Sequence, residues 1–104
     1  MIFRVLLTRP QVILTPKEQR GSGMVRKAEE LAAKHGWFLP RQFSNPANPA
    51  YHRMTTASEI LLDFAGARLD YWVTGTGTGG TMSGAGPALK QARPELKVFF
   101  SFMS

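Results

Sequence analysis

The feature that most limits what this chain can fold into is a glycine-rich segment directly after an apolar stretch. Residues 69–74 are mostly aromatic, aliphatic or β-branched, which predicts a strand. Residues 75–81 then consist only of glycine and threonine. A strand that leads straight into such a loop is typical of α/β proteins, in which ligands bind at the carboxyl ends of parallel strands.

The residue types in this loop point to a phosphate site. Glycines let the backbone reach positive φ and approach a ligand without a Cβ clash. Successive N–H groups can then face one anion, and the next helix adds the positive end of its dipole. Hydroxyls of Thr78 and Thr81 add two donors. The alternative, a tight strand-to-helix connection without a ligand, stays open.

Three kinds of phosphate ligand can be compared against the sequence. The glycines at 75, 77 and 80 match the dinucleotide spacing, but the acid expected about 20 residues later is missing. Residues 99–104 contain no acid, and Glu95 precedes the next predicted strand. No Gly-Lys-Ser/Thr triplet of a nucleotide-binding P-loop is present. Pyridoxal phosphate fits best, because its phosphate needs only a cup of donors.

Strands and helices are predicted to alternate along the chain. Further strands are expected at residues 12–15, 37–39 and 96–100. Helices are expected at residues 24–35, after a turn at residues 21–23, and at residues 49–64, with Asn48 as the cap. Gly36 should end the first helix. Gly84, Gly86 and Pro87 weaken the helix after the glycine loop, which should begin late, near Pro87. This order predicts an α/β fold of three layers with a mostly parallel sheet.

Composition excludes several classes of function. The 104 residues suffice for one domain, and the absence of cysteine excludes disulfides and thiolate metal sites. The histidines have no acidic or histidine partner at metal-ligand spacing, so no metal site is expected and both are assigned to the surface or to helix packing. The net charge of +6 comes from scattered lysines and arginines, so nucleic-acid binding is not expected. No apolar stretch nears the roughly 20 residues of a membrane span, and we expect a cytoplasmic protein.

Two motifs together resemble one enzyme family. Gly77-Thr-Gly-Gly-Thr81 and Gln42-Phe-Ser-Asn-Pro-Ala-Asn-Pro49 are similar to segments of cysteine synthase (O-acetylserine sulfhydrylase). That family belongs to the tryptophan-synthase-β-like, fold type II group of pyridoxal-phosphate enzymes. Shorter matches agree in the same order: Gly23-Met-x-x-Lys27-Ala28, Thr55-Thr56 and Glu59-Ile60. The resemblance covers about residues 12–98.

This resemblance implies an activity and a set of site residues. The family makes L-cysteine from O-acetylserine and sulfide by β-replacement on pyridoxal phosphate, and a homodimer or self-association is expected. The phosphate would be held by Gly77, Thr78, Gly79, Gly80 and Thr81. Gln42 would bind the substrate α-carboxylate; the alternative is that it satisfies the loop backbone. Asn45 and Asn48 are interpreted as loop and cap residues.

Other parts of the family pattern are not found. The family chain is much longer, and its Schiff-base lysine lies in a Ser-x-Lys-x-Arg-like motif. No lysine of this chain has that setting: Lys17, Lys27, Lys34, Lys90 and Lys97. We therefore assign no catalytic residue and expect this chain alone to be inactive. Residues 1–11 and 99–104 diverge from the family, so we expect one partial domain over residues 1–104, from a gene fragment or a disrupted reading frame. Alternatives are a non-catalytic module that binds a phosphate ligand or a subunit and, less favoured, a dinucleotide-binding domain.

Overall fold

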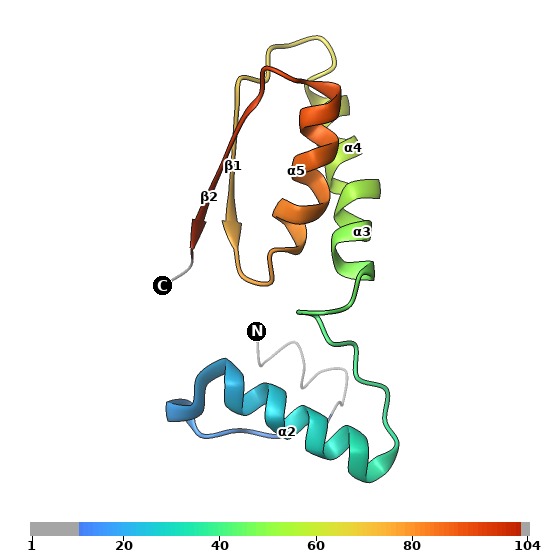
Figure 1. Cartoon of the computed structure of the whole chain (residues 1–104), viewed down its shortest axis with the longest axis vertical. Helices are drawn as coiled ribbons and strands as arrows, with labels where there is room; N and C mark the ends of the chain where they lie inside the picture. The colour runs from blue at the N-terminus through green and yellow to red at the C-terminus, as the bar shows by residue number, and fades with distance from the viewer. Residues whose placement is uncertain (1–10, 103–104) are drawn as a thin grey trace. The chain divides into compact units, whose positions relative to one another are not determined.

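The structure, a computed structural model, describes residues 11–102. The chain divides into two compact units, Met1–Leu39 and Pro40–Ser104. Figure 1 shows the elements of both units. The first unit contains the 3₁₀ helix η1 (Lys17–Gln19) and helix α2 (Arg20–His35). The second contains α3 (Ala47–Met54), α4 (Thr56–Asp63), β1 (Tyr71–Thr76), α5 (Gly80–Ala92) and β2 (Lys97–Phe102).

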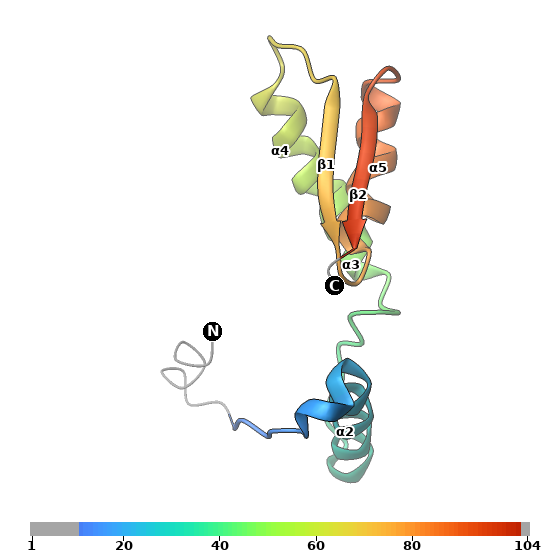
Figure 2. The ribbon, with the colours of Figure 1, turned by 90° about the vertical axis from the view of Figure 1, so that its left-hand side faces the viewer.

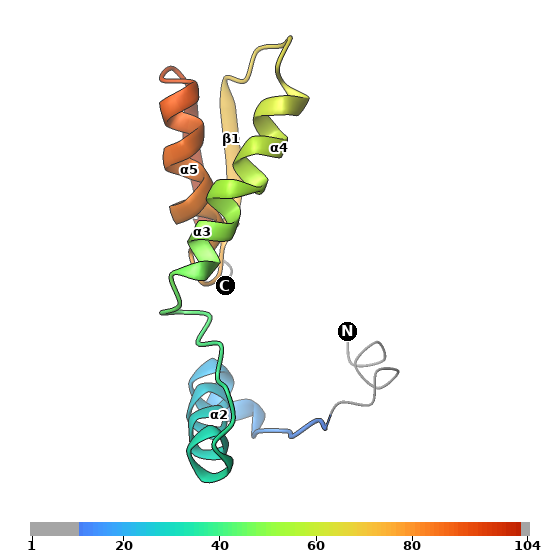
Figure 3. The same ribbon diagram turned by 90° about the vertical axis from the view of Figure 1, so that its right-hand side faces the viewer.

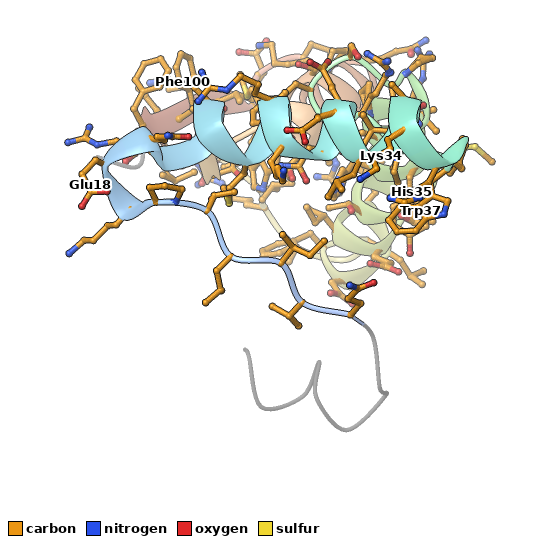
Figure 4. The ribbon with its side chains drawn as sticks, turned by 90° about the horizontal axis from the view of Figure 1, so that it is seen from below. Glu18, Lys34, His35, Trp37 and Phe100 are labelled. Atoms are coloured by element: carbon orange, nitrogen blue, oxygen red, sulfur yellow. The ribbon has the colours of Figure 1, made fainter. Side chains whose placement is uncertain are left out.

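Helix α2 confirms the predicted helix but begins earlier than expected. The glycines at 21 and 23, predicted to form a turn, lie inside it. A Cβ on Gly23 would overlap the Gln19 side chain, whose Oε1 accepts a hydrogen bond from the Arg26 side chain at 2.8 Å. The helix ends as predicted, because Gly36 adopts a left-handed φ of 68°. Trp37 then stacks on His35, with 4.4 Å between ring centroids, and Figure 4 labels this pair.

The two strands predicted in the first unit are wrong. Residues 12–15 and 37–39 have no regular structure. Leu14 and Phe38 are 82% and 86% exposed, so neither segment gains the burial that its apolar side chains suggested. A strand needs a neighbour to pair its backbone groups, and neither segment has one among the described residues. The divergent N-terminal segment lies, apart from Gln11, outside the described residues.

The long helix predicted at residues 49–64 is divided into α3 and α4. Thr55 separates them with φ −110° and ψ −68°. Its hydroxyl donates to the Tyr51 carbonyl at 2.8 Å, a back-bond that bends helices. Figure 3 shows α3 and α4 as successive segments beside α5.

The predicted parallel sheet is confirmed. Strands β1 and β2 pair in parallel, from Tyr71 opposite Lys97 to Thr76 opposite Phe102, and α5 forms the crossover between them. Helices α3, α4 and α5 all lie on one face of this sheet (Figures 1 and 2). On the opposite face Tyr71, Val73 and Phe99 are more than half exposed. The chain therefore has the expected α/β class, with helices on one sheet face within residues 40–102.

Helix α5 starts at Gly80, not near Pro87 as predicted. Pro87 lies inside it, although proline removes a helical hydrogen bond. Packing outweighs this cost, because Ala85 and Leu89 are completely buried against Ala57 and Leu96. These four residues form the core under the sheet. No described helix is long and apolar enough to cross a membrane.

Candidate functional site

The glycine loop (residues 77–81) joins the end of β1 to the start of α5. Gly79 caps α5 with φ 80°, a left-handed conformation that favours glycine. The first helical bond runs from the Ser83 N–H to the Gly79 carbonyl at 2.8 Å. The N–H groups of Thr81 and Met82 therefore have no acceptor within the helix. A Cβ at Gly77 would meet nothing within 4 Å, so the loop borders open space. This end of α5 is suited to an anion.

The Asn-Pro segment (residues 42–49) reaches α3 through a turn that Asn45 holds. The Asn45 amide donates to the Pro40 carbonyl at 2.8 Å, and its Oδ1 accepts the Ala47 N–H at 2.9 Å. Ala47 is the first residue of α3. Asn45 is therefore a loop residue, as predicted.

Asn48 has a different place from the one predicted. It lies inside α3 and is not its cap. Its Nδ2 donates to the Gln42 carbonyl at 2.9 Å and to the Thr78 hydroxyl at 2.9 Å. The side chain therefore connects the Asn-Pro segment to the glycine loop, 30 residues further along the chain.

Both motifs line one cavity, which we call the site cavity. Its volume is about 160 Å³. Gln42, Thr78, Gly79 and Gly80 line it, together with other residues of the Asn-Pro segment, of α3 and of α5: Phe43, Ser44, Asn45, Pro46, Asn48, Pro49 and Ser83. These lining residues offer hydroxyl, amide and backbone N–H donors and no carboxylate. A neutral, donor-rich lining suits a phosphate or carboxylate group.

Two of the predicted phosphate residues are placed apart from this lining. Gly77 directly follows β1 and precedes the lining residues, and Thr81 directs its hydroxyl to α3, with Oγ1 at 3.4 Å from His52 Nε2. The other ring nitrogen of His52, Nδ1, lies 2.8 Å from the Thr56 hydroxyl. His52 thus packs between helices, as predicted, but it also has polar contacts that sequence reasoning missed. Its spacing of four residues from Thr56 was the available signal.

A larger cavity lies at the other end of the strands. It measures about 260 Å³ and is lined by residues 68–70 and 92–96. Lys90 fixes the chain there by donating to the carbonyls of Pro94 and Leu96, at 2.6 and 3.0 Å. Since parallel α/β sheets bind ligands at the carboxyl ends of their strands, the site cavity is the stronger candidate. Among residues 11–102, no cluster of acidic residues and histidines could hold a metal ion.

The chain, including both motifs, is similar to one known protein family. The sequence profile of the family described as pyridoxal-phosphate dependent enzyme matches residues 6–101. The match extends beyond the residues 12–98 expected from the motifs and includes most of β2.

The matches to individual relatives cover most of this chain but a smaller share of each relative. An O-ureido-L-serine synthase from Streptomyces lavendulae is 58% identical over 88 residues, which are 85% of this chain and 27% of the relative. A cysteine synthase from Staphylococcus aureus is 44% identical, over 85% of this chain and 28% of its own. The crystal structure of an O-acetylserine dependent cystathionine beta-synthase from Helicobacter pylori superposes with a TM-score of 0.83 at 37% identity, over 95% of this chain and 32% of that one. The chain thus spans about a quarter to a third of the proteins it matches.

Proposed function

Because the chain belongs to the pyridoxal-phosphate dependent enzyme family, we propose that residues 40–102 hold the phosphate of that cofactor. The proposed phosphate site consists of Thr78, Gly79 and Gly80, which line the site cavity, with Gly77 and the backbone N–H of Thr81 next to them in the chain. The observation that carries this assignment is the site cavity, which brings the glycine loop and the Asn-Pro segment together at the carboxyl end of β1. Residues 1–104 are then one part of a pyridoxal-phosphate enzyme domain.

Each part of the site has a separate task. The N–H groups of Thr81 and Met82, which have no acceptor within the helix, and the Thr78 hydroxyl donate to the phosphate oxygens. Gln42, on the same cavity, donates its side-chain amide to the α-carboxylate of an amino-acid substrate. When bound, pyridoxal phosphate supplies an electron sink that stabilises a carbanion at the substrate α-carbon. The two lysines of residues 40–102, Lys90 and Lys97, lie at the other end of the sheet from the site cavity. Neither is assigned to the reaction, so binding and orientation are the tasks of residues 40–102.

The reaction that we propose for the enzyme is β-replacement of the cysteine synthase type, in which O-acetylserine and sulfide give L-cysteine. The cysteine synthase relative and the O-acetylserine dependent neighbour support this choice. A second candidate is formation of O-ureido-L-serine. It is supported by the higher identity to the synthase of that name, 58% against 44% for the cysteine synthase over the same length. Both candidates place the cofactor phosphate in the same glycine loop.

A binding experiment tests the proposed phosphate site. The purified chain is titrated with pyridoxal phosphate, followed by absorbance, and inorganic phosphate is added as a competitor. Gly79→Asp puts a carboxylate and a Cβ at a position with φ 80°, and it should weaken binding at least about tenfold. Gly66→Asp is the matched control, since Gly66 lies in the turns after α4 with nothing within 4 Å of an added Cβ. Equal affinities of the two variants would contradict the assignment.

The two candidate reactions are separated by ligand preference. The cofactor-loaded chain is titrated with L-cysteine and with O-ureido-L-serine, and the spectral change of the cofactor is followed. Tighter binding of O-ureido-L-serine would favour the second candidate. Gln42→Ala should weaken either amino acid and leave cofactor binding unchanged, since Gln42 is assigned to the substrate carboxylate.

A further inference from the structure

The side chain of Asn48 connects the two motifs of the site cavity. Its amide group has two protons, and each has an acceptor: the Gln42 carbonyl and the Thr78 hydroxyl, both at 2.9 Å. One side chain thus fixes the residue assigned to the substrate carboxylate and a residue assigned to the phosphate. A residue that only packed α3 against the loop would not need both bonds.

The hydrogen bonds of Thr78 determine what its hydroxyl can still do. A hydroxyl has two acceptor positions and one proton. Oγ1 of Thr78 accepts from Asn48 Nδ2 at 2.9 Å and from the Gly80 N–H at 3.3 Å. Both acceptor positions are therefore occupied, and only the proton remains. Since Thr78 lines the site cavity, this proton is available to an acceptor bound there.

Asn48 also explains the glycine at position 80. Gly80 is not among the residues with positive φ, so backbone conformation does not require glycine there. A Cβ on Gly80 would instead overlap the Asn48 amide. The side chain occupies the space directly beside the first residue of α5, where it can reach Thr78.

We propose that Asn48 is a positioning residue that makes Thr78 an obligatory donor to the bound anion and couples the phosphate site to the backbone of Gln42. The inference rests on the proposed function, because the anion is the cofactor phosphate. Asn48 lines the site cavity, but both of its amide protons are already donated, so it acts through Thr78.

Substitution by aspartate gives the sharpest test. Asn48→Asp keeps the shape of the side chain but replaces its donor by a carboxylate oxygen, which accepts the Thr78 proton and so removes it from the ligand. Asn48→Ala removes the donor and leaves the Thr78 proton free. The proposal predicts a greater loss for aspartate than for alanine, and it predicts that a Thr78→Val background removes this difference. Simple repulsion between the carboxylate and the phosphate would leave the difference in place, because Asn48 also lines the cavity. Gln91→Glu is the control for an amide-to-carboxylate change, because Gln91 is exposed near the C-terminal end of α5 and does not line the site cavity.

The readout compares pyridoxal phosphate with pyridoxal, which lacks the phosphate, in equilibrium binding to the purified chain. The preference for pyridoxal phosphate should fall about 10- to 100-fold in Asn48→Asp, less in Asn48→Ala and little in Gln91→Glu. Thr78→Val should reproduce the loss, and Thr78→Ser should retain the preference. An unchanged preference in Asn48→Asp would overturn the proposal.

A second measurement tests the Asn48–Thr78 contact without the cofactor. Urea midpoints are compared for Asn48→Ala, Thr78→Val and the double variant. If Asn48 holds the Thr78 hydroxyl, the double variant loses clearly less stability than the two single changes together. Strict additivity would overturn the proposal. A wild-type chain with no preference for pyridoxal phosphate would refute the proposed function, and non-additivity in this cycle would still support the contact between Asn48 and Thr78.

Discussion

The two units of the chain differ in what holds their helices in place. In residues 11–39 most of the large apolar side chains are more than 40% exposed: Val12, Ile13, Leu14, Met24, Val25, Trp37 and Phe38. In residues 40–102, by contrast, Leu89 and Leu96 are almost completely buried between the helices and the sheet. Helix α2 therefore depends on local contacts such as its glycine cap and side-chain pairs. Helices α3–α5 depend on tertiary packing, and this is the unit that contains the site cavity.

The difference shows where a ligand site can be built. A site needs groups from distant segments held within a fraction of an ångström, and only packed elements provide this. The Asn48–Thr78 bond, which joins positions 30 residues apart, is of this kind. In α2, a bond such as that from Lys27 to Glu30 joins residues that are close in the chain.

Truncation of a core leucine should give the largest difference in stability between the two units. Leu89→Ala leaves a cavity between α5 and the sheet, and we expect a loss of about 2–5 kcal/mol from the free energy of unfolding. Val25→Ala in α2, at a side chain that is 42% exposed, should change it by no more than about 0.5 kcal/mol. Urea unfolding is followed by fluorescence of Trp72 in a Trp37→Phe background. Equal losses in the two variants would mean that the units are stabilised alike.

Two glycines of α5 test whether close backbone contact holds the second unit together. A Cβ at position 84 would overlap the Pro49 carbonyl of α3, so Gly84→Ala should destabilise by about 1–3 kcal/mol. At position 86 the nearest atom is Met82 Sδ at 3.6 Å, an ordinary contact. Gly86→Ala should therefore be neutral, or stabilise by up to about 1 kcal/mol through helix propensity. Thermal unfolding followed by circular dichroism compares the two. A loss at position 86 as large as that at 84 would contradict this account of α3–α5 packing.

The smallest effect concerns the surface of α2. The hydrogen bond and charge of Lys27 lower the pKa of Glu30, with weaker help from Lys34 and Arg26. A lowered pKa in the folded state means that this support of α2 is present above the ordinary pKa of glutamate and is lost as the pH falls through the lowered value. Lys27→Gln should raise the pKa of Glu30 in an NMR titration, and Lys34→Gln should raise it less. Signals of α3–α5 should not respond, and identical shifts in both variants would contradict the assignment to Lys27.

Much of the second unit could be predicted from the residues in order. Both strands, the parallel pairing and the glycine loop follow from patterns within a few residues, and Gly36 was correctly predicted to end α2. The strands predicted at 12–15 and 37–39 failed for a physical reason. Their residues suit a strand, but strand formation depends on a paired neighbour, which local sequence does not report. The late start predicted for α5 failed because propensity was weighed without the burial of Ala85 and Leu89.

The sequence by itself determined the chemistry of the candidate site: glycine and threonine after a strand, in a loop suited to phosphate. Only the tertiary structure decided which other residues serve that loop. Asn48 was predicted to cap a helix, but it bonds Thr78 and excludes a Cβ at Gly80. The reason is that backbone preferences depend on neighbours in the chain. The hydrogen bonds of Thr78 depend instead on the Asn48 side chain, which α3–α5 packing brings from 30 residues away.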